Sequence, residues 1–261
     1  MIRASLLCGV VLLAAGCPKP AMRPYPPPTG EELLAALRGR AEHLKSLRAT
    51  AKVDHFANGG ERVRIKANIL VARGGKLRFE ADSPLGGALA TLTSDGTQFS
   101  LLDVRNNRFL TGPAKACNVA RLIRLAIPPD DVVAVLMGEA PLEGKLKGVT
   151  WDPNHGGREV LTLSTADGGE ETIQLDAAEK RWDVMRAERR DAGGKVLWRV
   201  TNSGFKDHGG VRLPDVSDIE EPPHGADAEI KFRAVEPNVE LPEELFRLPP
   251  PQGLTPEAAD C

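Results

Sequence analysis

The sequence lacks the signatures by which many enzymes are recognised. It contains no Gly-x-Ser-x-Gly nucleophile elbow, no P-loop and no dinucleotide-binding fingerprint. The pairs Asp130-Asp131 and Glu220-Glu221 fit the first turn of a helix and a solvated turn, respectively. Five histidines are scattered without the spacing of metal ligands: His43, His55, His155, His208 and His224. We therefore expect no metal site and no resident cofactor, and we predict that the protein is not an enzyme.

The chain also has little net charge. It carries 34 Lys and Arg against 36 Asp and Glu, which gives a formal net charge of -2 at pH 7. This balance indicates no polyanionic partner, and there is no basic stripe, RNP signature or zinc-finger spacing, so we expect no nucleic acid to bind. After residue 17 no apolar run reaches the length of a membrane span.

The first seventeen residues have the pattern of an export signal. Arg3 supplies a positive charge, an apolar run follows from Leu6 to Ala15, and small residues lead into Cys17. An apolar stretch this short is typical of a signal peptide rather than a membrane span. The sequence Leu-Ala-Ala-Gly-Cys at 13–17 resembles a bacterial lipobox. The resemblance implies that residues 1–16 are removed and that Cys17 receives a thioether-linked diacylglycerol and an N-acyl chain; the alternative is ordinary secretion with Cys17 as a plain thiol.

Residues 17–30 are predicted to connect this lipid to the folded domain. Prolines are frequent here, as in extended linkers, so we expect a Pro-rich tether. Several acyl chains anchor a protein stably, whereas a single chain binds only reversibly. Because Pro18 rather than Asp follows Cys17, the resemblance to proteobacterial lipoproteins implies a lipid-anchored protein of the cell outer membrane that faces the periplasm.

The remaining cysteines leave two alternatives. With Cys17 modified, Cys117 and Cys261 form an even pair in an oxidising compartment. They either form a disulfide or are two unrelated thiols, since Cys261 is the last residue and chain ends are often poorly ordered.

Beyond the tether, the apolar spacing changes from helical to strand-like. A capping-box pattern begins at Thr29, and apolar residues then recur at helical spacing, which predicts a helix over about 31–45. From Leu47 onward apolar and polar residues alternate, as in antiparallel strands with one buried face. Glycine-rich and Asx turns divide this pattern into strands near 47–54, 62–71, 76–82, 88–94, 97–103, 107–111, 146–152, 158–165, 170–176, 181–189, 195–205, 210–218 and 228–236.

A helical segment interrupts the strands. Val119, Leu122, Ile123 and Ala126 lie at helical spacing, and a second short helix is indicated between Pro128-Pro129 and Gly138. Because a long antiparallel sheet tends to curl, we predict a mainly β (α+β) fold. Its curved antiparallel sheet forms a half-open barrel with an N-terminal helix and an inserted helical lid. The alternative is that these helices simply fill the core. The domain is expected over 31–248, followed by a flexible tail over 249–261.

The order of these elements resembles the LolB outer-membrane lipoprotein receptor and its LolA-like relatives. The most specific pieces are the loop Ser83-Pro84-Leu85-Gly86-Gly87 and the segment Leu136-Met137-Gly138-Glu139-Ala140-Pro141. The resemblance is clearest over residues 44–141 and weakens to a shared strand pattern after them. The segment 230–251 is similar to the ending of other LolA-like periplasmic proteins.

The resemblance implies an apolar cavity for acyl chains and a membrane-insertion loop. Leu85 matches the loop leucine, and Pro84 with Gly86-Gly87 favours a turn that presents it outward; the alternative is a core residue at a strand end. An apolar concave face would hold a hydrophobic ligand. The residues expected to line it are Val63, Ile65, Ile69, Leu77, Phe79, Val119, Leu122, Ile123, Val133 and Leu136.

Two functions are therefore predicted. The first is an envelope lipoprotein that binds the acyl chains of lipoproteins or other lipids. In this role it would act in the localisation of lipoproteins to the outer membrane or in their insertion into it, and a periplasmic carrier protein is a candidate partner. The second is a structural or signalling envelope lipoprotein that keeps the fold but binds a protein partner.

Overall fold

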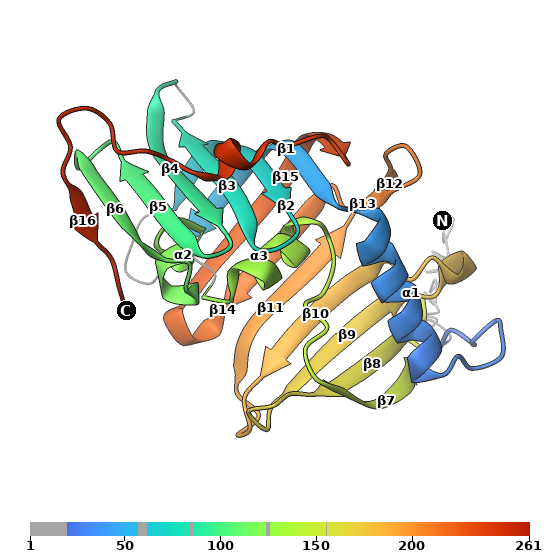
Figure 1. Ribbon diagram of the computed structural model, residues 1–261. Helices are drawn as coiled ribbons and strands as arrows, with labels where there is room; N and C mark the ends of the chain where they lie inside the picture. Colours follow the sequence, from blue (N-terminus) through green and yellow to red (C-terminus); the bar gives the residue numbers. More distant parts are fainter. Residues whose placement is uncertain (1–19, 57–61, 84–85, 124–125, 155) are drawn as a thin grey trace, which may run out of the picture.

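A single large, curved sheet organises the chain (Figure 1). The computed structural model describes residues 20–56, 62–83, 86–123, 126–154 and 156–261. Within these residues the large sheet has 14 strands in the order β16-β6-β5-β4-β3-β2-β1-β15-β14-β11-β10-β9-β8-β7. All neighbouring pairs are antiparallel except β16 with β6. The sheet has two edges, β16 and β7, so it is curved without being closed, as predicted for a half-open barrel.

The long strands β1 and β15 join the two halves of the sheet by pairing in the middle. The first half consists of β1 (Ser46–Phe56), β2 (Val63–Ala72), β3 (Lys76–Asp82), β4 (Ala88–Asp95), β5 (Gln98–Asp103) and β6 (Arg108–Pro113). The second consists of β7 (Lys145–Asp152), β8 (Arg158–Ser164), β9 (Glu170–Asp176), β10 (Val184–Arg190), β11 (Val196–Ser203), β14 (Val216–Glu221) and β15 (Ala226–Pro237). The strand expected near 210–218 is divided at Pro214 into β13 (Arg212–Leu213), which pairs with β12 (Lys206–Asp207), and β14.

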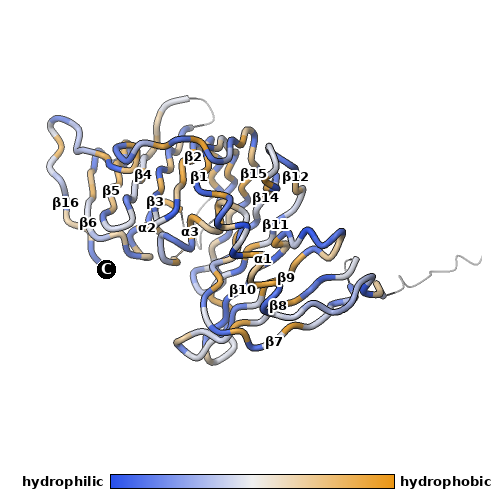
Figure 2. The backbone as a smooth tube through the Cα atoms, turned by 45° about the vertical axis from the view of Figure 1, so that its right-hand side comes forward, coloured by the Kyte–Doolittle hydropathy of each residue, from blue (hydrophilic) through white to orange (hydrophobic). Residues whose placement is uncertain are grey.

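The apolar alternation of the sequence becomes the core of the molecule. In β1, Leu47, Ala49, Ala51 and Val53 are all buried, while the residues between them face outward. Figure 2 shows the same alternation of apolar and polar residues along the other strands. One face of the sheet is therefore apolar and the other polar, as expected for antiparallel strands with one solvated face.

Helix α1 (Gly30–His43) covers the second half of the sheet (Figure 1). It begins with the predicted capping box: the Glu32 amide donates to the Thr29 hydroxyl at 3.2 Å, and the Thr29 amide donates to the Glu32 carboxylate at 2.6 Å. Its apolar side buries Leu33, Leu34 and Leu37, which holds the helix against the sheet.

Helices α2 (Ala116–Ile123) and α3 (Pro129–Leu136) lie against the first half of the sheet, inside its curve (Figure 1). In α3 every residue from Val132 to Leu136 is buried. The chain leaves α3 through Gly138 at φ 71°, and a Cβ there would lie 2.5 Å from Cδ of Pro214, so this turn requires glycine. The expected helical insert is thus present, and α3 fills the core as well as covering it.

The segment after the second half is ordered by specific contacts, so the expectation of a flexible tail at 249–261 does not hold. A 3₁₀ turn over Glu243–Phe246 buries Phe246 against the sheet. Strand β16 (Pro256–Ala258) then adds to β6, and the Ala259 amide donates to Thr111 O at 2.8 Å. Cys261 forms a disulfide with Cys117 of α2, with a Cα–Cα distance of 6.3 Å. The disulfide and these hydrogen bonds fix the end of the chain.

Residues 20–29 also differ from the expected free tether. The Ala21 amide donates to Pro153 O at 2.9 Å, and Trp151 donates its indole N–H to Ala21 O at 3.0 Å. Arg23 pairs with the buried carboxylate of Glu159 through contacts of 2.8 and 3.0 Å. These contacts bind the Pro-rich segment to the edge of the second half from about residue 20 onward. Cys17 and residues 1–16 lie outside the described residues.

Candidate lipid-binding cavity

An apolar cavity of about 300 Å³ lies between the last turn of α2 and the inner face of the sheet. Strands β1 to β5 and β15 contribute Val53, His55, Val63, Ile65, Phe79, Ala81, Leu89, Ala90, Leu101, Asp103, Ala228 and Ile230. Helix α2 contributes Arg121, Leu122 and Ile123, and the turn after β5 contributes Arg105 and Asn106. Most of these side chains are apolar because they occupy the inward positions of the alternating strands.

Polar side chains also line this cavity, among them Asp103, Asn106 and Arg121. Asn106 donates to the Asp103 carboxylate at 2.7 Å, and Arg121 donates to the Asn118 side-chain oxygen at 3.2 Å. Val63 at the start of β2 is 45% exposed, which makes it one of the few large apolar side chains open to solvent. The cavity therefore combines apolar walls with a few charged and polar side chains, a pattern common in sites for amphipathic ligands.

The cavity contains half of the residues predicted to line it. Val63, Ile65, Phe79, Leu122 and Ile123 line it.

The other five predicted lining residues lie elsewhere. Ile69, Leu77, Val119 and Leu136 are packed inside the core and line neither this cavity nor the second one described below, while Val133 lines the second. Periodicity gives the inward face of a strand but not the depth at which a helix fills the space, so it does not separate these five residues from the five that line the first cavity.

The loop between β3 and β4 adjoins this cavity through its two strands. Ala81 at the end of β3 and Leu89 near the start of β4 line the cavity. The loop is closed by the Ser83 amide donating to Gly87 O at 2.9 Å. Leu85, the predicted membrane-insertion residue, belongs to this loop but lies outside the described residues.

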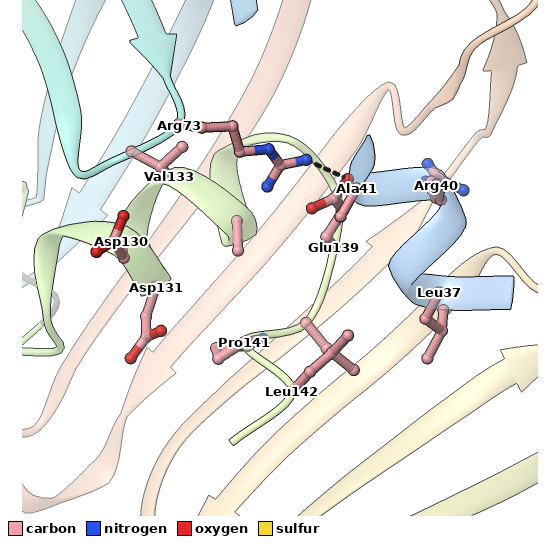
Figure 3. Close-up of a pocket in the computed structure, with 12 residues that line it drawn as sticks. Leu37, Arg40, Ala41, Arg73, Asp130, Asp131, Val133, Glu139, Pro141 and Leu142 are labelled. Carbon is pink, nitrogen blue, oxygen red and sulfur yellow. Dashed lines mark hydrogen bonds and ion pairs between the residues drawn. The ribbon is translucent and has the colours of Figure 1, made fainter. Parts of the chain in front are cut away.

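A second cavity, of about 200 Å³, separates α1 from α3 (Figure 3). Its apolar lining includes Leu37, Val133 and Leu142. Figure 3 shows Arg73 reaching across it to Glu139, a contact of 2.8 Å. This ion pair ties the β2–β3 turn to the segment that follows α3.

Carboxyl groups crowd beside this second cavity. Burial, followed by the charge of Glu143 and a hydrogen bond to it, raises the pKa of Asp131 to about 7. Burial also raises the pKa of Glu171 to about 8, although the Glu143 amide donates to its Oε2 at 2.9 Å. Oε1 of Glu171 is buried without a hydrogen-bond partner. Asp131 was assigned to the first turn of a helix, where it lies, but its contacts with Glu143 and Glu171 require the tertiary fold.

The residues that the structure describes contain no group of three or more His, Cys, Asp or Glu that could hold a metal ion. None of their helices is long and apolar enough to cross a membrane.

Comparison with solved structures shows the fold. Neither a protein-family model nor a curated protein matches the sequence. A LolA-superfamily protein of Nitrosomonas europaea aligns with a TM-score of 0.60 at 10% identity, covering 85% of this chain and 99% of that one. A putative outer-membrane lipoprotein-sorting protein domain of Vibrio parahaemolyticus aligns with a TM-score of 0.60 at 14% identity, covering 83% and 97%. A DUF1329-family protein of Desulfovibrio piger aligns with a TM-score of 0.59 at 12% identity, covering 84% and 95%. This chain therefore has a divergent LolA fold.

Proposed function

We propose that this protein is a lipid-anchored envelope lipoprotein that binds an acyl chain and acts in lipoprotein localisation to, or insertion into, the outer membrane. The observation that carries the proposal is the apolar cavity under α2, whose walls continue into the strands that flank the loop of Leu85. An acyl chain in this cavity would leave water for an apolar lining, which is favourable in proportion to the area buried. In this role the protein is a binding protein without catalytic chemistry.

The fold and the leader support this proposal. One structural neighbour is a putative outer-membrane lipoprotein-sorting protein domain, which makes a related role reasonable for this chain. The lipobox-like sequence at 13–17 supports lipidation of Cys17, and Pro18 supports sorting to the outer membrane. A lipidated Cys17 would lie only four residues before Ala21, whose amide donates to Pro153 O in the domain. The anchor would thus hold the domain close to the membrane.

The volume of the cavity limits the size of the ligand that it can hold. Its volume of about 300 Å³ is at the lower end of ligand pockets, which span roughly 300–1,000 Å³. We therefore expect one acyl chain to enter rather than several. The head of the ligand would remain beside Asp103, Arg105 and Arg121, which are acidic or basic residues of the lining.

Binding of a fluorescent fatty-acid analogue tests the proposal. Leu122→Gln places a polar side chain in the cavity wall and should weaken saturable binding by about 10-fold or more. The matched control is Leu197→Gln, because Leu197 is similarly half-buried in the sheet but lines neither cavity. The control should bind as the unmodified protein does. Equal losses in both variants, or no saturable binding by a folded protein, would count against a lipid site.

A protein-binding role is the second candidate. It is favoured by the packing of α3, whose buried residues occupy space that a larger lipid cavity would need. In this case the folded protein would fail to bind the fatty-acid analogue while retaining a partner on its surface.

A further inference from the structure

Three lysines stand side by side on the outer face at the middle of the sheet. Lys52 of β1 lies directly opposite Lys66 of β2 on one side and Lys231 of β15 on the other. All three are exposed. Directly opposite residues on one face of an antiparallel pair have Cβ atoms about 4.5–5.5 Å apart. The three side chains, here called the lysine row, therefore extend from adjacent positions on one face of the sheet.

The lysine row lies in a hollow of about 490 Å³ that has an excess of positive charge. The charged residues that line the hollow are Lys52, Asp54, Arg64, Lys66, Glu229, Lys231 and Arg233. Five of these are cations and two are carboxylates, whereas the whole chain has a formal net charge of -2. The positive charge is thus a local property of this hollow, since on the same face Asp82 lies directly opposite Lys66 and Asp218 lies opposite Glu229.

The two carboxylates already have partners. Asp54 pairs with Arg62 at 3.0 Å and with Arg64 at 3.1 Å, and Glu229 pairs with Lys231 at 2.6 Å. Lys52, Lys66 and Arg233 take part in none of the ion pairs found among the described residues. Like charges directly opposite each other destabilise a sheet. The lysine row therefore makes the fold less stable than neutral residues at the same three positions would.

We propose that the lysine row, with Arg233, docks the protein on an anionic membrane surface by binding lipid phosphates. The row is exposed on a sheet face rather than enclosed, so it suits an extended surface of negative charge. Lysine is a flexible point charge, which matches mobile headgroups better than the rigid bidentate pairing typical of arginine. Juxtamembrane basic residues are attracted to anionic lipid surfaces in this way.

The surface lies back to back with the apolar cavity. Val53, Ile65 and Ile230 point inward from the same three strands and line that cavity. Headgroup binding outside and chain binding inside would therefore use the same strands, and Val53 and Ile65 line both the hollow and the cavity. The membrane-docking proposal does not depend on acyl-chain binding or on lipidation of Cys17. An experiment can therefore refute any one of these three hypotheses and leave the other two standing.

Vesicle sedimentation with the unlipidated chain from Pro18 to Cys261 tests the proposal. This chain contains every helix and strand described here. We expect it to bind phosphatidylcholine vesicles that contain phosphatidylglycerol, to bind pure phosphatidylcholine vesicles much less, and to be released by salt. Replacing the row with glutamine (Lys52→Gln, Lys66→Gln and Lys231→Gln) should weaken binding by about 100-fold, at about 5-fold per lysine.

A second triple variant separates the row from total charge. Lys45→Gln, Lys145→Gln and Lys195→Gln remove the same charge from exposed lysines outside the hollow and should leave binding unchanged. The row variant should melt at the same temperature as the unmodified protein or higher, because repulsion is relieved. If it does not fold by circular dichroism, Lys52→Gln alone should still show the 5-fold loss. Equal losses in both triple variants, equal binding to neutral vesicles, or no binding of the folded protein to anionic vesicles would each overturn the proposal.

Discussion

At the scale of single residues, Asp131 and Glu171 are the side chains whose chemistry the fold changes most. Each has its pKa raised, to about 7 and about 8, chiefly by burial and then by neighbouring carboxylates. The folded state therefore holds more protons than the unfolded state between about pH 4 and pH 8. The two protonated carboxyl groups make their full contribution to the free energy of unfolding below the ordinary carboxyl pKa. This contribution is lost as the pH rises through the folded-state pKa values of about 7 and about 8.

We predict that Asp131→Asn will make the free energy of unfolding depend less steeply on pH. An amide cannot ionise, so the variant should gain roughly 1–3 kcal/mol of unfolding free energy at pH 8 relative to the unmodified protein. Urea unfolding at pH 5, 6, 7 and 8 is the measurement. Asp130→Asn is the control, because Asp130 is the exposed neighbour in the same turn and its charge is the smallest of the causes that raise the Asp131 pKa, so it should change the slope only slightly. A pH slope as steep in Asp131→Asn as in the unmodified protein would show that Glu171 and other groups cause it without Asp131.

A second prediction at this scale concerns Leu85. If its loop serves membrane insertion, Leu85→Glu should change stability by less than about 0.5 kcal/mol, as exposed substitutions usually do. It should nevertheless abolish transfer of a client lipoprotein to membranes while the client still binds. A core position would instead lose several kcal/mol on burying a carboxylate, which thermal melting would reveal. Normal transfer by a stable Leu85→Glu protein would refute the insertion role.

At the scale of elements, the end of the chain fastens α2 to the edge of the sheet. The Cys117–Cys261 disulfide links residues 144 apart in sequence. Asn118 adds a hydrogen bond to Ala259 O at 3.1 Å and one to Pro113 O at 2.9 Å. Helix α2, which forms one wall of the apolar cavity, is therefore positioned by β16 as well as by its own apolar side.

We predict that removing this disulfide destabilises the fold. Closing a long loop lowers the entropy of the unfolded chain, and native disulfides typically contribute about 2–5 kcal/mol. Cys117→Ser, Cys261→Ser and the double variant should all lose unfolding free energy within this range and by equal amounts, measured in urea under oxidising conditions. Additive losses in the double variant would mean that the two thiols act independently.

At the scale of the whole molecule, the proposed lipid anchor at Cys17 would decide where the domain resides. We predict that Cys17→Ala, which removes the acceptor thiol, leaves the protein without label from a radioactive fatty acid and absent from washed membranes. If the lysine row alone retains the variant on membranes, that fraction should be released by salt, whereas acylated protein should not be. Label in the Cys17→Ala protein, or recovery of the unmodified protein in the inner membrane, would contradict the anchor or its sorting.

The sequence alone was sufficient for much of the architecture. Local rules place a capping box at Thr29 and acidic residues at the start of α3, and period-two alternation identifies the strands. These patterns concern residues within a few positions of each other. The inward side of each strand and the existence of the helical insert therefore follow from local sequence.

The residues that line the apolar cavity were predictable only in part, because local sequence patterns do not tell which helix packs over a given strand position. Phe79 and Leu77 occupy the same face of β3, yet Phe79 lines the cavity and Leu77 is packed in the core. Which of the two meets empty space depends on where α2 and α3 lie over the sheet. Helix position is set by packing between segments far apart in sequence, and periodicity carries no information about it.

What the sequence determined by itself is the alternation that makes one sheet face apolar, and the local caps and turns, because each depends on neighbouring residues; the export signal at residues 1–16 is a prediction from the same kind of local pattern. Only the tertiary structure decided which side chains from distant strands meet. It placed Cys261 beside Cys117, Glu171 beside Asp131, and Lys52 between Lys66 and Lys231. The near-neutral composition of the chain does not reveal the lysine row. The pairing of strands, and not the number of charged residues, decides where side chains of like charge come together.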